Sequence, residues 1–261
     1  MAALFERGAQ GVQDGEDFVL THFPPGSDLD AVCSALQASD PEATVETWAV
    51  PETDWSRAWR DGIRAHRLGR LTIAPPWLAH DLDAETAIII DPGMAFGTGE
   101  HATTRGVVRL LQDVIREGDS VADLGAGSAV LAIAAARLGA RSVFAIELDP
   151  DAIPNAEFNV RANSVADRVV VLEGDAALFL PLVAPVRVVI ANIISSVLAS
   201  ILPHIRQALT EGGVAILSGM LQEERERMLA LFSAEGWAVE GEDSEDAWWS
   251  VSLRPVEGKE R

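Results

Sequence analysis

The sequence predicts an α/β protein whose main part is a seven-stranded, mostly parallel sheet, preceded by a small α+β domain. Short apolar and β-branched runs alternate with helical patterns over residues 85–217, which is typical of parallel strands covered on both faces. Two further strand-like runs, 237–239 and 248–253, follow each other without a helix between them, and they predict an antiparallel pair at a sheet edge. The first fifty residues show neither pattern and form a separate unit.

The small domain is predicted over residues 1–53. Residues 18–23 read as a strand, and a helix follows with Asp28 or Asp30 as its N-cap. Residues 44–50 alternate between apolar and polar side chains, as a half-buried strand does. Together these elements predict a small α+β unit.

A connector over residues 54–80 precedes the main domain, which is predicted over 81–261. Apolar residues from Trp55 to Ile63 have helical spacing, and 71–73 predicts a short strand. The predicted strands and helices of the main domain, besides the closing pair, are strands 88–90, 120–124, 142–146, 168–172, 187–191 and 214–217 and helices 107–115, 130–138 and 198–209. A seven-stranded sheet that ends in such an antiparallel pair is the arrangement of class I methyltransferases, which have a Rossmann-like sheet.

The composition is that of a globular protein. The chain has 261 residues, 48% of them hydrophobic, and no run of eighteen apolar residues predicts a transmembrane helix. The N-terminus lacks the pattern of a signal peptide. A single cysteine, Cys33, excludes an intrachain disulfide and a CxxC metal site. We therefore expect a cytoplasmic, monomeric protein without a metal or a membrane.

The formal net charge of −20 argues against nucleic acid as the main partner, because phosphate binding needs clustered Lys and Arg. An acidic balance would attract a cationic substrate or cofactor. Solubility is the simpler explanation of the same charge, so charge alone does not identify the ligand.

The loop Asp123-Leu-Gly125-Ala-Gly127 lies between a predicted strand and a helix, where an open α/β sheet binds its ligand. Glycines there let the backbone approach either a dinucleotide or a methyl donor closely. Asp123 would repel a pyrophosphate at this turn, but it would attract the ammonium and sulfonium of S-adenosylmethionine. Ala129 also departs from the dinucleotide fingerprint. We therefore expect S-adenosylmethionine to bind at Asp123, Gly125 and Gly127.

Acidic residues follow the next two strands. Glu147 ends the second strand, about twenty residues on, where a carboxylate can accept both ribose hydroxyls. The competing Asp149, before Pro150, is predicted to cap the following helix instead. Asp175 follows the third strand, where it either accepts a hydrogen bond from the adenine amino group or belongs to an ordinary polar loop.

Asn192 ends the fourth strand, on the side where the methyl donor is expected. A planar amide at this place can accept a hydrogen bond from an amine and direct the amine's lone pair toward the methyl group. Asn192 is therefore the predicted catalytic residue as well as a cofactor contact. The alternative is an ordinary turn asparagine at the end of a strand.

The stretch from Asp91 to Thr104 precedes the first helix of the main domain. Its glycines and threonines can wrap a ligand, with Phe96 over it, or they can form a capped turn with Thr103 or Thr104 as the cap. His101 has no acidic partner in the sequence that would indicate a general base.

Three stretches together resemble the family of ribosomal protein L11 methyltransferases: 91–104, 123–128 and 191–194. The connector is also similar to that family, and the resemblance covers about residues 5–253. Phe-Gly-Thr-Gly, residues 96–99, is its most specific part.

The resemblance implies methylation of lysine side chains and of the N-terminal α-amine of a large-subunit ribosomal protein, L11. It implies that the small N-terminal domain holds this substrate. Carried over by position, Thr104, Gly125, Glu147 and Asn192 would contact the cofactor.

The sequence departs from the family's pattern at several places. Ala129 replaces the usual third glycine, Glu147 stands where Asp is common, and Ile-Ile-Ser-Ser-Val follows Asn192. The chain begins inside what would be the first helix, so the small domain is expected to lack the family's opening strand.

The predicted reaction is direct transfer of a methyl group from the sulfonium to an amine nitrogen. A methyltransferase for another protein or a small amine is the alternative within this class. A nicotinamide-dependent oxidoreductase is disfavoured by Asp123 and the missing third glycine. A cofactor-binding protein without catalysis is disfavoured by Asn192.

Overall fold

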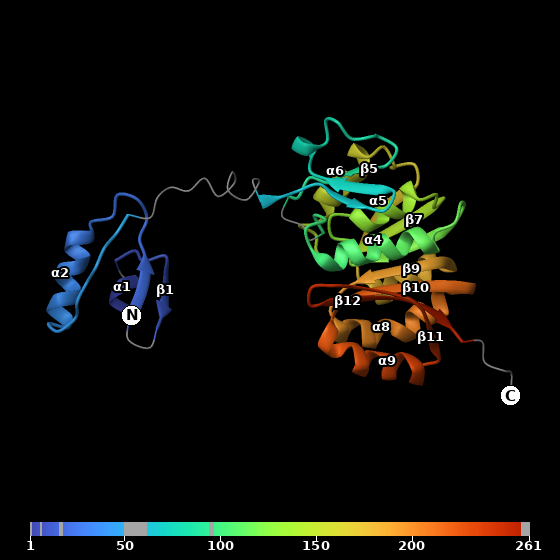
Figure 1. Cartoon of the computed structure of the whole chain (residues 1–261). Helices are drawn as coiled ribbons and strands as arrows, with labels where there is room; N and C mark the ends of the chain where they lie inside the picture. The colour runs from blue at the N-terminus through green and yellow to red at the C-terminus, as the bar shows by residue number, and fades with distance from the viewer. Residues whose placement is uncertain (1, 6, 16–17, 50–61, 94–96, 257–261) are drawn as a thin grey trace. The chain divides into compact units, whose positions relative to one another are not determined.

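The structure is a computed structural model, and it describes residues 2–5, 7–15, 18–49, 62–93 and 97–256 (Figure 1). The chain divides into two units, Met1–Ala58 and Trp59–Arg261. The predicted connector helix between Trp55 and Ile63 falls almost wholly outside the described residues, and the predicted boundaries at 53 and 80 stay a prediction.

The first unit contains α1 (Ala2–Phe5), β1 (Gly11–Asp14), β2 (Val19–His22) and α2 (Leu29–Ser39). The two strands pair antiparallel, with Gly11 opposite His22. The predicted strand at 18–23 and the helix after it are confirmed. Asp28, not Asp30, is the N-cap, because its carboxylate accepts a 3.0 Å hydrogen bond from the backbone N–H of Ala31.

In this unit one strand was missed and one predicted strand was wrong. The strand β1 was not predicted, because Gly11-Val-Gln-Asp is too short and polar to show a period. The predicted strand at 44–50 is absent over its described residues, 44–49. The alternation there has no strand beside it among the described residues, and Trp48 is 63% exposed. A strand needs a hydrogen-bonding neighbour, which a local pattern cannot supply.

A three-stranded sheet opens the described part of the second unit. It contains β3 (His66–Leu68), β4 (Leu71–Ala74) and β5 (Ala87–Ile89), with a short helix, η1 (Pro76–Leu78), after β4. The predicted strand at 71–73 is confirmed. The predicted strand at 88–90 exists, but it pairs with β4 rather than joining the large sheet. An apolar run indicates burial, and it does not say which strand lies beside it.

The large sheet has the order β11-β12-β10-β9-β6-β7-β8. Its strands are β6 (Ser120–Leu124), β7 (Ser142–Glu147), β8 (Val169–Glu173), β9 (Val186–Asn192), β10 (Leu209–Leu221), β11 (Trp237–Glu245) and β12 (Trp248–Pro255). The strands β6 to β10 run parallel to one another, and β12 is antiparallel to both of its neighbours. The predicted seven-stranded, mainly parallel sheet with an antiparallel pair at its edge is confirmed.

Helices cover both faces of this sheet (Figure 1). They are α4 (Ala102–Val114), α5 (Val130–Arg137), α6 (Ile153–Ala162), α7 (Ala176–Val183), α8 (Ser195–Ala208) and α9 (Arg225–Ala234), with the short η2 (Gln222–Glu224) before the last. Val121 packs with α4, α5 and α6, whereas Ala122 and Leu124 pack with α7, α8 and α9. Successive residues of a strand point to opposite faces, so β6, which is covered on both faces, is buried along almost its whole length.

The strand order reverses at β6, which pairs in parallel with both β7 and β9. At such a switch point the loops after two neighbouring strands lead to helices on opposite faces, and a crevice opens between them at the carboxyl ends. The loops after β6 and β9 therefore border the place where a ligand is expected.

Among the described residues, no helix is long and apolar enough to cross a membrane. The same part of the chain holds no group of His, Cys, Asp and Glu side chains arranged to bind a metal ion.

Candidate functional site

The loop after β6 turns sharply because Gly125 and Gly127 have positive φ angles of 71° and 52°. The backbone N–H groups of Gly125 and Ala126 both donate to the carbonyl of Ile146, at 2.9 and 3.1 Å. A Cβ on Gly125 would lie only 2.8 Å from Cγ2 of Ile193. Glycine is thus required at position 125 both by its backbone angle and by the closeness of the loop after β9.

Gly125→Ala is expected to weaken binding of S-adenosylhomocysteine about tenfold, since the loop must shift to make room for the side chain of the alanine. It is also expected to cost about 1–2 kcal/mol of stability from the left-handed backbone angle. Calorimetric titration and urea unfolding measure the two effects.

Gly118→Ala is the matched control for this change. Gly118 has a φ of +85°, but nothing lies within 4 Å of its would-be Cβ. It should lose similar stability and keep its affinity. If both variants bind equally well, the loop after β6 does not form the binding site.

Asp123, the penultimate residue of β6, is fully buried. Neither carboxylate oxygen has a hydrogen-bond partner among the described residues. Burial, with a smaller contribution from the charge of Glu147, raises the pKa of Asp123 to about 7. The backbone N–H of Ala132 opposes this shift, although it is outside hydrogen-bonding geometry. An unpaired buried carboxylate is costly unless a ligand compensates it, so this position fits a cationic group.

Glu147 ends β7 beside the glycine loop. Its two oxygens accept hydrogen bonds from the backbone N–H groups of Gly127, at 2.7 Å, and Asp149, at 2.9 Å. Each carboxylate oxygen has a second lone pair. Glu147 can therefore hold the loop and still accept hydroxyl groups of a ligand.

The predicted capping role of Asp149 was wrong. The helix α6 begins at Ile153, with Ala152 as its N-cap. Asp149 instead accepts a 2.9 Å hydrogen bond from the backbone N–H of Asp151. This local Asx turn satisfies the carboxylate before the helix begins, and sequence spacing does not distinguish the two arrangements.

Asp175 follows β8, and its Oδ1 accepts a 2.7 Å hydrogen bond from the backbone N–H of Ala177, capping α7. The side chain is exposed. Capping uses one carboxylate oxygen, so the adenine contact stays a prediction.

Asn192 is the last residue of β9. Its neighbour Ala191 lies opposite Leu124 in β6, which brings Asn192 level with Gly125 at the carboxyl edge of the sheet. On the other side, Asn192 pairs with Ser218 of β10. The side-chain amide of Asn192 makes no hydrogen bond with the described residues, so its oxygen and its nitrogen are both available to a ligand.

Thr104 lies in the first turn of α4 and is fully buried. Its hydroxyl has no hydrogen-bond partner among the described residues. The adjacent carbonyl of Thr103 lies 3.5 Å from Oγ of Ser218, and Ser218 pairs with Asn192. Thr104 is therefore close to the strand ends that carry the other candidate residues.

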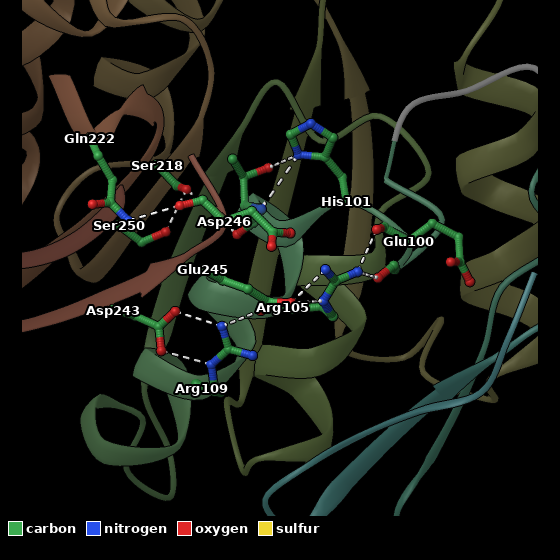
Figure 2. A network of polar contacts seen from close by, with 12 residues as sticks. Glu100, His101, Arg105, Arg109, Ser218, Gln222, Asp243, Glu245, Asp246 and Ser250 are labelled. Atoms are coloured by element: carbon green, nitrogen blue, oxygen red, sulfur yellow. Dashed lines mark hydrogen bonds and ion pairs between the residues drawn. The ribbon is translucent and has the colours of Figure 1, made fainter. Parts of the chain in front are cut away.

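The predicted cap of α4, Thr103 or Thr104, was wrong: the N-cap is His101, whose Nδ1 accepts from the backbone N–H of Thr103 at 3.4 Å. Nδ1 of His101 also lies 2.7 Å from Oγ1 of Thr103. Figure 2 shows the imidazole of His101 beside the start of α4. Burial lowers the pKa of His101, and the positive charge of Arg105 lowers it further. A neutral imidazole serves as a cap because it keeps an acceptor nitrogen.

Phe96 lies outside the described residues, so its predicted contact with the ligand stays a prediction. The next residues, Gly97–Glu100, lie against the glycine loop: the carbonyl of Gly97 accepts a 2.6 Å hydrogen bond from the buried hydroxyl of Ser128. The role of Ser128 was not predicted, because a serine after a glycine loop carries no signal for a partner 31 residues away. The contact places the Phe-Gly-Thr-Gly stretch beside the candidate site.

The open polar groups of β6, β9 and α4 belong to Asp123, Asn192 and Thr104. A carboxylate suits an ammonium, and the acid at the end of β7 suits ribose hydroxyls. Buried groups without partners fit a polar ligand rather than an apolar core. The doubly covered sheet and these residues define a class I, S-adenosylmethionine-dependent methyltransferase.

Comparison with known proteins gives the family. The chain matches the family model of ribosomal protein L11 methyltransferases (PrmA) over residues 3–255, and it belongs to that family. It is 40% identical over 216 residues to the ribosomal protein L11 methyltransferase of Pelotomaculum thermopropionicum, covering 82% of this chain and 70% of that protein. It is 35% identical over 248 residues to the one of Thermus thermophilus, covering 95% and 91%.

A solved structure supports the same assignment. The ribosomal protein L11 methylase of Lactobacillus delbrueckii subsp. bulgaricus is similar with a TM-score of 0.66 and 26% sequence identity, covering 74% of this chain and 99% of that one. The protein is thus an S-adenosylmethionine-dependent protein methyltransferase.

Proposed function

We propose that this protein transfers methyl groups to amines of ribosomal protein L11, namely lysine side chains and the N-terminal α-amine. The names of its relatives support the substrate. The observation that carries the reaction is the open amide of Asn192, level with Gly125 where two parallel strands end. The acidic net charge supports a cationic protein substrate.

Six groups of this chain would hold the cofactor. Asp123 takes the ammonium directly or through water, Glu147 the ribose hydroxyls, and Asp175 the adenine amino group. Thr104 and the glycine loop contact the rest of the molecule, with Phe96 over it. When bound, S-adenosylmethionine supplies a methyl group on a good leaving group, so the protein mainly aligns the reactants.

The acceptor amine must lose its proton before it can attack. A lysine in water has a pKa near ~10.4. Leaving water for the pocket beside Asn192 disfavours the charged ammonium and lowers that pKa. The side-chain oxygen of Asn192 then accepts a hydrogen bond from an amine N–H, which directs the lone pair toward the methyl group. No dedicated base is needed if the proton passes to water as the amine enters the pocket.

The small N-terminal domain, residues 1–53, is proposed to hold the protein substrate. The protein is proposed to act as a monomer in the cytoplasm without binding nucleic acid directly.

Incubating the protein with isotopically labelled S-adenosylmethionine and purified large-subunit ribosomal proteins tests the function. We expect label on L11 alone, with mass spectrometry placing the methyl groups on lysines and the N-terminal amine. L11 whose amines have been acetylated beforehand is the control and should take up no label. Label on another protein, or on none while the cofactor binds, would overturn the proposed substrate.

A further inference from the structure

A network of ion pairs joins α4 to the edge strand β11 (Figure 2). Arg105 and Arg109 lie one turn apart on α4, so they project from the same face. Arg105 donates to Oε1 of Glu245 at 2.5 and 2.8 Å. Arg109 donates to both oxygens of Asp243 at 2.6 and 2.7 Å and to Oε2 of Glu245 at 2.6 Å.

Only one of the two arginines also contacts the Gly97–Glu100 segment. Nη1 of Arg105 donates to the carbonyl of Gly99, at 3.2 Å, and to the carbonyl of Glu100. Arg109 makes no hydrogen bond to that segment among the described residues. The two side chains therefore share Glu245 but differ in what else they bind.

The Gly97–Glu100 segment needs such anchors because its glycines leave the backbone free. Gly97 and Gly99 have φ angles of +98° and +90°, and glycine adopts many other angles equally well. One anchor is the hydrogen bond that the hydroxyl of Ser128, directly after the glycine loop, donates to the carbonyl of Gly97. Another is Glu100, whose carboxylate accepts from Nε2 of His66 and from the backbone N–H of Arg64, both at 2.9 Å.

The anchor from Arg105 is a strong one. Its side chain is only 12% exposed, so water competes little for its hydrogen bonds. Glu245 compensates the buried charge and fixes the plane of the guanidinium, which leaves one nitrogen directed at the two carbonyls. The hydrogen bond from Arg105 lowers the pKa of Glu245, and the bond from Arg109 does so as well, so the carboxylate stays ionised at neutral pH.

We propose that Arg105, oriented by Glu245, is a positioning residue that holds the Gly97–Glu100 segment against the glycine loop and thereby sets the affinity for S-adenosylmethionine. This inference rests on the proposed cofactor site. A segment already held in its binding conformation loses less entropy when the ligand arrives. Removing the anchor therefore weakens binding of the cofactor without changing the groups that align the amine.

The test compares Arg105→Ala with Arg109→Ala in the full chain. Both variants lose an ion pair to Glu245, but only the first loses the bonds to Gly99 and Glu100. We expect Arg105→Ala to weaken S-adenosylhomocysteine binding about tenfold and to raise the KM for S-adenosylmethionine similarly, with kcat within about twofold. Arg109→Ala should change both constants less than about twofold, and Arg105→Lys should recover part of the affinity because an ammonium can still donate to a carbonyl.

Each outcome decides the question. Equal losses of affinity in the two alanine variants, or unchanged affinity in Arg105→Ala, would overturn the proposal. If Arg105→Ala does not fold, Arg105→Lys and Glu245→Gln replace it, and unchanged affinity in both would overturn the proposal equally. If the unsubstituted protein itself does not bind S-adenosylhomocysteine, the proposed function fails rather than the role of Arg105.

Discussion

Asn192→Ala is expected to lower kcat about 100-fold while changing the affinity for S-adenosylhomocysteine less than about threefold. The amide stands at the end of β9 without a partner among the described residues, so its loss leaves no buried group unsatisfied. What is lost is the alignment of the amine, and a misplacement of about 1 Å can cost about 100-fold in rate. Single-turnover methylation and calorimetric titration measure the two quantities.

Asn192→Asp tests whether the chemistry of the side-chain amide aligns the acceptor amine, or whether any side chain of the same shape is sufficient. The carboxylate has the same shape, but it favours the charged ammonium, which has no lone pair for the attack. We expect its activity to be low at neutral pH and to rise as the pH increases. Equal losses of turnover and cofactor affinity in Asn192→Ala would assign the residue to cofactor binding alone.

Asp123→Asn is expected to weaken S-adenosylhomocysteine binding by about 10- to 100-fold, because a hydrogen bond to a charged group contributes about 1.5–3 kcal/mol. The free protein is expected to gain stability at the same time, since the substitution removes a fully buried carboxylate without a partner among the described residues. Binding and stability therefore change in opposite directions, which a general loss of structure would not produce.

The stability gained by Asp123→Asn should depend on pH. Burial raises the pKa of Asp123 from 3.8 to about 7, so the folded state holds its proton over a range where the unfolded chain has lost it. The stability from the protonated carboxyl is fully present below about pH 4 and is lost as the pH rises through about 7. The difference between the variant and the unsubstituted protein should widen from pH 5 to about 7 and then level off.

Urea unfolding of both proteins without cofactor, at several values between pH 5 and 8, measures this difference. All other titrating groups are shared, so they cancel in the comparison. If the difference in stability between the two proteins does not vary with pH, Asp123 is ionised throughout this range. Burial would then not raise its pKa, and the prediction would be wrong.

Many of the candidate residues follow from the sequence because strand ends are visible in it. Asp123, Glu147 and Asn192 each end a short apolar run, and the carboxyl ends of parallel strands meet at one edge of a sheet. The charge of Asp123 decides between two cofactors that the glycines alone leave open. These inferences use only neighbours in sequence and the general topology of α/β folds.

Capping and strand pairing were harder to predict. Asp149, Thr103 and Thr104 were assigned as caps, but His101 and Ala152 hold those positions. Several polar residues within one turn can satisfy the same N–H groups, and their energies differ by only about 1 kcal/mol. The strand at 88–90 was assigned to the wrong sheet for a related reason, since its apolar character is the same beside either set of neighbours.

The sequence by itself determined the fold class, the glycine loop and the acid that selects a methyl donor, because these depend on periods of two and 3.6 residues and on groups close together in the chain. Only the tertiary structure decided which polar groups remain open. It showed that Asp123 and Thr104 have no partner among the described residues, and it joined Arg105 to Glu245 across 140 positions. Such contacts depend on how helices and strands pack, and packing brings together side chains whose spacing in the chain carries no period.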